Sequence, residues 1–89
     1  MACKLDSRDK ILNIVIDVLN SFLDDSNQVK TEDDDLSAFD SQAKRLLYFP
    51  IRDVVEAQGC STEGISAAKF ENYKKVKDIV DAIEAAQKS

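Results

Sequence analysis

Apolar residues recur at spacings of three and four through both ends of the chain, which is the period of an amphipathic α-helix. The first such stretch predicts a helix from Ser7 to about Leu23, with Asp6 or Ser7 as its N-cap. The last predicts a helix from Tyr73 to about Gln87. No window shows the alternation of apolar and polar residues that a half-buried strand requires. The chain is therefore predicted to fold without a sheet.

The middle of the chain has the same helical spacing, and its apolar face is predicted to turn inward Leu46, Leu47 and Phe49. The start of this helix is predicted between Ser37 and Ser41, where Ser37-Ala-Phe-Asp40 resembles a capping box. Pro50 has no N–H for the helical ladder and disfavours helix at the preceding residue, so the helix is predicted to kink or split there. It should end at Gly59, before a turn and a short helix over 65–70.

These elements predict an all-α fold, a small four-helix bundle whose second helix is kinked or split at Pro50. With 89 residues the chain is expected to form a single domain, 1–89, too small for a deep enclosed cavity. The predicted core follows from the apolar faces: Ile11, Val15, Val18, Leu19, Phe22, Leu47, Ile51, Val55, Ile65, Val76, Ile79, Val80 and Ile83.

The stretch 24–35 separates the first two helices and contains seven charged residues among twelve. Val29 is its one apolar anchor, and Leu36 follows it. This composition predicts a solvated loop. We expect it to be mobile and to tighten modestly as salt screens its self-repulsion. The spacing lacks the alternating carboxylates and central glycine of an EF-hand, so calcium is not predicted.

Charge and composition argue against several classes of function. The net charge of −5 repels phosphate backbones and anionic lipid, so neither nucleic acid nor membrane is predicted as a partner. A local cluster of lysines is read as the solvated face of a helix: Lys69, Lys74, Lys75 and Lys77. The chain has no histidine, the commonest general base near neutral pH and the commonest nitrogen ligand for transition metals. We therefore predict neither an enzyme nor a metal site.

The two cysteines, Cys3 and Cys60, lie far apart and lack the close spacing of zinc or redox motifs. They are interpreted as reduced, unreactive thiols of a cytoplasmic protein. Cys3 lies too near the start to follow a signal peptide. The apolar run from Ile11 to Leu19 is interrupted by polar residues and is too short to span a bilayer.

Asp40-Ser41 is the one place where a nucleophilic oxygen stands in a suggestive setting, between an acidic run and a basic helical stretch. Asp and Ser are also ordinary helix N-caps, because a short side-chain oxygen can accept from the unpaired amides of the first turn. By position alone, plain capping is the favoured interpretation. A wider pattern in the sequence strengthens the functional one.

The last third of the chain reads Ile65-Ser-Ala-Ala-Lys-Phe-Glu-Asn-Tyr-Lys-Lys-Val76-Lys-Asp-Ile-Val-Asp-Ala-Ile83. These apolar positions, those of the first helix and the order of the predicted elements resemble the acyl and peptidyl carrier proteins over most of the chain. In that family an Asp-Ser-Leu motif opens the second helix, and its serine bears a 4′-phosphopantetheine arm. Asp40-Ser41-Gln42 is the best match here. Gln42 stands where the family has Leu, and Lys44 and Arg45 stand where it has an acidic surface.

The resemblance implies a carrier of an acyl or aminoacyl intermediate on an arm at Ser41, with Asp40 orienting the loop. The implied partners are a phosphopantetheinyl transferase and enzymes of fatty-acid, polyketide or non-ribosomal peptide biosynthesis, met by a monomer through Lys44, Arg45 and Tyr48. The alternative is a helical adaptor of the same fold without the prosthetic group, which binds protein partners through the same basic stretch, Tyr48 and Phe49. For Tyr48-Phe49, core packing is the favoured interpretation.

Overall fold

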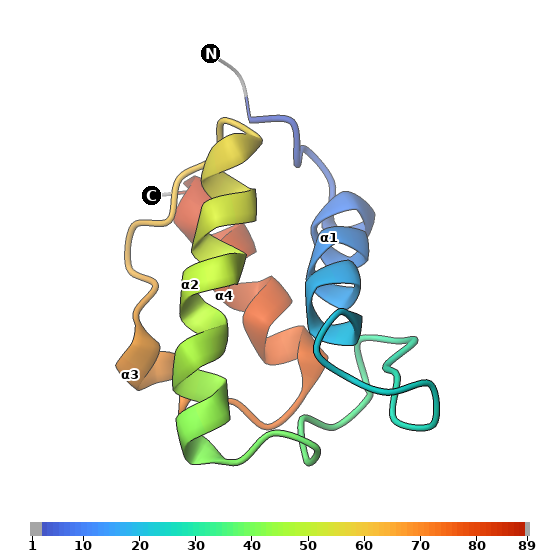
Figure 1. Cartoon of the computed structure of the whole chain (residues 1–89). Coiled ribbons are helices and arrows are strands. Elements are labelled where there is room, and N and C mark those ends of the chain that lie inside the picture. The colour runs from blue at the N-terminus through green and yellow to red at the C-terminus, as the bar shows by residue number, and fades with distance from the viewer. Residues whose placement is uncertain (1–2, 89) are drawn as a thin grey trace.

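The computed structural model describes residues 3–88 and contains four helices in this range (Figure 1). They are α1 (Arg8–Asn20), α2 (Ser41–Ala57), α3 (Ala67–Phe70) and α4 (Val76–Lys88). Helix α1 packs on α4 and on α2, and the short α3 packs on α2. Between residues 3 and 88 the sole β-type pairing is an isolated bridge from Asp35 to Lys75. The predicted all-α class with four helices is therefore confirmed.

Helix α1 begins as predicted but ends three residues early. The Ser7 hydroxyl caps it by accepting from the Lys10 amide at 3.3 Å. After Asn20 the amides of Ser21, Phe22 and Leu23 each reach back three residues, the tighter pattern typical of a helix end. The Asn20 side chain both donates to and accepts from the backbone of Val29, at 2.9 and 2.8 Å. The helix therefore ends at Asn20, although the apolar spacing alone predicts that it continues to about Leu23.

Of the two alternatives predicted at Pro50, a kink or a split, the split is wrong, because α2 runs uninterrupted through this residue. The missing N–H removes the bond that the Leu46 carbonyl would receive. Leu46 is 58% exposed, so water can hydrate its unpaired carbonyl. Pro50, which is half-buried, is therefore accommodated within the helix.

Helix α2 ends in a Schellman motif. Gly59 has φ +77°, a region that glycine enters without steric cost. Its amide donates to the Glu56 carbonyl at 3.0 Å, and the Cys60 amide donates to the Val55 carbonyl at 3.2 Å. The predicted role of Gly59 is confirmed, and the motif places Cys60 in the core beside Val55.

The core matches the predicted apolar faces with two exceptions: Val18 is half-buried and Phe22 is 59% exposed. The inward prediction also fails for Leu46 and Phe49. The buried face of α2 instead consists of Leu47, Ile51 and Val55, and the two exposed residues lie beside it. Seven further residues complete the core from the loops and helix ends: Leu5, Val29, Leu36, Phe39, Cys60, Phe70 and Ala86.

The second half of the long loop is held against the start of α4. The amides of Val76 and Lys77 donate to the carbonyls of Asp34 and Glu32, at 3.0 and 2.8 Å, and thereby satisfy two donors that a helix start leaves unpaired. The Leu36 amide donates to the Lys74 carbonyl at 2.9 Å. Hydrogen bonds from the Lys30 and Thr31 amides lower the pKa of the Asp34 carboxyl.

Because of these contacts, we expect mobility in the first part of the loop and not in its second part. We expect backbone NMR relaxation at low and high ionic strength to differ within residues 24–28, which are exposed, and to be unchanged within 29–36. Residues 29–36 are anchored by two buried side chains and by backbone bonds, which salt does not screen. A salt response spread evenly over 24–36 would mean that these anchors are weak.

Candidate functional site

Asp40 is the N-cap of α2, and Ser41 is its first helical residue. The Asp40 backbone is extended, and its carboxylate accepts from the Ala43 amide at 2.8 Å. The Asp40 carbonyl accepts the first helical bond from the Lys44 amide at 2.9 Å. The capping interpretation is thus confirmed for Asp40, and the predicted box beginning at Ser37 is one turn too early.

The Ser41 side chain is exposed at this helix start. In an α-helix the amides of the first turn have no helical acceptor, and the aligned peptide dipoles place partial positive charge there. Lys44 and Arg45 follow Ser41 by three and four residues, the spacing at which side chains share one face. An oxyanion on Ser41 would therefore be placed near the amides of the first turn, on the helix face that also carries Lys44 and Arg45.

The face of α2 that carries Ser41 packs against α3 and the segment after it. The Lys44 ammonium donates to the Tyr73 carbonyl at 2.8 Å. The Arg45 guanidinium pairs with the Glu71 carboxylate at 3.2 Å, in a position where both side chains are substantially exposed. The Tyr48 ring is half-buried and meets Phe70 edge to face at 5.9 Å. The residues predicted to contact partners are thus also the residues that attach α2 to α3.

Tyr48 and Phe49 differ in their surroundings, so core packing describes the first better than the second. Their rings are 5.2 Å apart, and Phe49 is 46% exposed. The Arg52 guanidinium lies over both rings, 5.5 Å from the centroid of Tyr48 and 5.7 Å from that of Phe49. This cation–π contact fixes the orientation of the aromatic pair on the surface of α2.

An open groove lies between the end of α1 and the first three turns of α2, on a different face of α2 from Ser41. Its volume is about 720 Å³. We call it the α1–α2 groove, and its lining consists of Phe22, Leu23, Ala38, Phe39, Ala43, Leu46, Leu47, Phe49, Pro50 and Asp53. Apolar spacing alone does not reveal this groove, because it places the exposed lining residues Phe22, Leu46 and Phe49 in the core. The spacing of Ala43, Leu46 and Phe49 is the signal that could have indicated a second apolar face.

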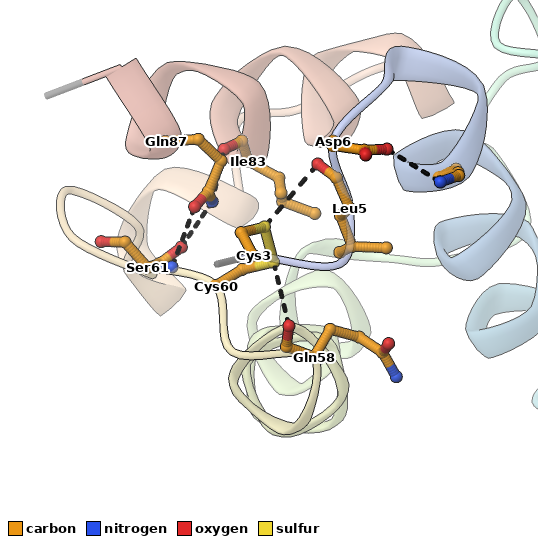
Figure 2. Close-up of a disulfide and its surroundings, with 9 residues drawn as sticks. Cys3, Leu5, Asp6, Gln58, Cys60, Ser61, Ile83 and Gln87 are labelled. Carbon is orange, nitrogen blue, oxygen red and sulfur yellow. Dashed lines mark hydrogen bonds and ion pairs between the residues drawn. A yellow bond between two sulfur atoms is a disulfide. The ribbon is translucent and has the colours of Figure 1, made fainter. Parts of the chain in front are cut away.

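The two cysteines are joined in a disulfide, so their interpretation as reduced thiols is wrong (Figure 2). Their Cα atoms are 4.5 Å apart. The N-terminal segment runs along the end of α2, where the Lys4 amide donates to the Gln58 carbonyl at 2.9 Å and Leu5 is buried. A disulfide persists in an oxidising environment, so one support for the cytoplasmic prediction is lost.

The turn that carries Cys60 is fixed from its other side by α4. The Gln87 side chain accepts from the Ser61 amide at 2.9 Å and donates to the Ser61 carbonyl at 2.7 Å (Figure 2). The carbonyl oxygens of Leu5 and Gln58 lie 3.7 Å from the two sulfur atoms. These are contacts without a proton, because a disulfide sulfur has none to donate. Three segments distant in sequence therefore meet at this end of the molecule.

A cluster of ion pairs around Arg8 connects the loop, α1 and α4. The Arg8 guanidinium pairs with Glu32 and Asp81 at 2.7 Å each and with Glu84 at 3.3 Å. The hydrogen bonds that Arg8 donates to Glu32 and, next in effect, to Asp81 raise the pKa of Arg8. Since all four side chains are partly exposed, the cluster adds little to the stability of the fold, and the loop is held chiefly by its backbone bonds to α4.

Across residues 3–88, no helix has the length and apolar character needed to cross a membrane. Within the same range, no three or more cysteine or carboxylate side chains are grouped so that they could hold a metal ion. A comparison with protein-family models found no match, and searches of curated proteins and of solved structures found none either.

Proposed function

We propose that this chain is a carrier protein that bears an acyl or aminoacyl intermediate on a 4′-phosphopantetheine arm attached to Ser41. The observation that carries the proposal is the exposed Ser41 hydroxyl at the first residue of α2, directly after the Asp40 cap. The order of a long helix, a long acidic loop, a middle helix, a short helix and a final helix supports it as well. The process served is fatty-acid, polyketide or non-ribosomal peptide biosynthesis.

The proposed modification needs little chemistry from this chain. The Ser41 oxygen attacks the phosphorus of coenzyme A that bears the pantetheine group, the anhydride bond to the nucleotide breaks, and adenosine 3′,5′-bisphosphate leaves. The transferase supplies the base that takes the hydroxyl proton. The chain contributes an accessible oxygen at a helix start, where the amides of the first turn and the helix dipole favour a phosphodiester. The cargo then sits on the thiol of the arm.

The alternative is a helical adaptor without a prosthetic group. The exposed aromatic and aliphatic side chains on α2 favour it, because contiguous exposed apolar residues often mark protein-binding surfaces. An adaptor would not need the Ser41 hydroxyl. Under either proposal the chain acts as a monomer with protein partners.

Incubation with coenzyme A and a broad-specificity phosphopantetheinyl transferase is expected to add one arm to the wild type and none to Ser41→Ala. Ser37→Ala is the matched control, since Ser37 is also exposed and lies one turn before the helix. It should accept the arm. Intact mass reports the modification, and far-UV circular dichroism verifies that each variant is folded. A folded wild type that stays unmodified would contradict the carrier proposal and leave the adaptor.

A further inference from the structure

The largest exposed apolar side chains within residues 3–88 gather in one place. Phe22, Leu46 and Phe49 are 59%, 58% and 46% exposed, and all three line the α1–α2 groove. Single exposed apolar residues are ordinary on protein surfaces, whereas a contiguous apolar patch marks an interaction site. The grouping of these three side chains in one groove therefore indicates a binding surface, which none of them would indicate alone.

The groove is long enough to bind one helix. Its α2 wall runs from Ala43 to Asp53, about 15 Å at the helical rise. Phe22 and Leu23 form the opposite wall from the end of α1, and the well-buried Phe39 and Leu47 lie at its base. A helix that presents apolar residues at positions i, i+3 or i+4, and i+7 extends its contacts over about 10 Å, which fits within this length.

The surroundings of the groove are acidic. Asp53 is the one ionisable residue among those that line it, and its side chain is 69% exposed. Asp24 and Asp25 directly follow the lining residue Leu23, and Asp40 directly follows Phe39. Arg52, whose guanidinium lies over the ring of Phe49, pairs with the Asp53 carboxylate at 3.5 Å, so the acidic character of the rim rests mainly on Asp24, Asp25 and Asp40. A partner with positive charges beside its apolar stripe would be complementary to this rim.

We propose that the α1–α2 groove docks an amphipathic helix of a protein partner whose apolar stripe is flanked by lysine or arginine. A second copy of the chain fits less well, because each copy carries a net charge of −5 and an isologous contact would bring two acidic rims together. The proposal does not depend on an arm at Ser41, since Ser41 lies on another face of α2.

The test uses three synthetic helical peptides of about 18 residues, long enough to hold helical structure on binding. One has leucine at the stripe positions and lysine beside them. The second has glutamate in place of each lysine, and the third scrambles the first. Backbone amide shifts of the isotope-labelled chain give both the affinity and the location of binding. The double variant Leu46→Gln/Phe49→Gln removes two apolar contacts at exposed positions, and Ala85→Gln, at an exposed position on α4, is the control outside the groove.

The lysine peptide is expected to bind the wild type and Ala85→Gln alike, with shifts centred on residues 22–23 and 43–53. Its affinity should fall by about tenfold or more in the double variant and with the glutamate peptide. Equal affinity for all three peptides, or shifts centred elsewhere, would overturn the proposal. Sedimentation of the chain alone provides a further test: a dimer that the double variant abolishes would identify a second copy as the occupant and overturn the proposal too.

Discussion

Loss of the Cys3–Cys60 disulfide is expected to lower the free energy of unfolding by about 4 kcal/mol. The bond closes a loop of 57 residues, and the chain entropy that such a loop removes from the unfolded state corresponds to this value. A small domain has a total stability of about 5–15 kcal/mol, so the loss is a large share of the whole. The double variant Cys3→Ala/Cys60→Ala should show it in urea unfolding.

Reduction supplies the matched control for this prediction. A thiol reductant should destabilise the wild type to the level of the double variant and leave the variant itself unchanged. Both proteins should keep the helical circular dichroism spectrum, because the helices pack through the core that lies beyond the disulfide. A wild type whose unfolding curve is indifferent to reductant would mean that the bond is absent in solution.

Leu47→Ala is expected to cost about 2–5 kcal/mol, the range for truncating a well-packed leucine. Leu47 is 4% exposed and lies on the inward face of α2. The neighbouring Leu46 provides a control with the same change of side chain in the same helix. At 58% exposure, Leu46→Ala should alter stability by about 0.5 kcal/mol or less. Equal losses for the two variants, measured by urea unfolding, would contradict the orientation of α2.

The helices and most of the core could be predicted because the apolar period is determined by local spacing. Ile11, Val15 and Leu19 form the buried face of α1 that this spacing indicates. Phe22 continues the period but is exposed, because the Asn20 side chain binds the backbone of Val29 and the helix ends. That bond joins residues nine apart, and apolar periodicity carries no information about it.

The position of Ser41 at a helix start could be predicted from local chemistry, since Asp40 is a good N-cap and the apolar period begins after it. The contacts around Ser41 could not be predicted in this way. The bond from Lys44 to Tyr73 joins residues 29 apart, and the disulfide spans 57. Such contacts depend on how the helices pack. Apolar spacing also places Leu46 and Phe49 in the core, because one helix can carry two apolar faces and sequence alone does not tell which is covered.

The most direct measurement is tandem mass spectrometry of the wild-type chain after incubation with coenzyme A and a phosphopantetheinyl transferase. Digestion and fragmentation locate any arm at a single residue. The carrier proposal predicts one phosphopantetheine arm, attached to Ser41. A folded chain without an arm, or an arm on a different serine, would contradict it.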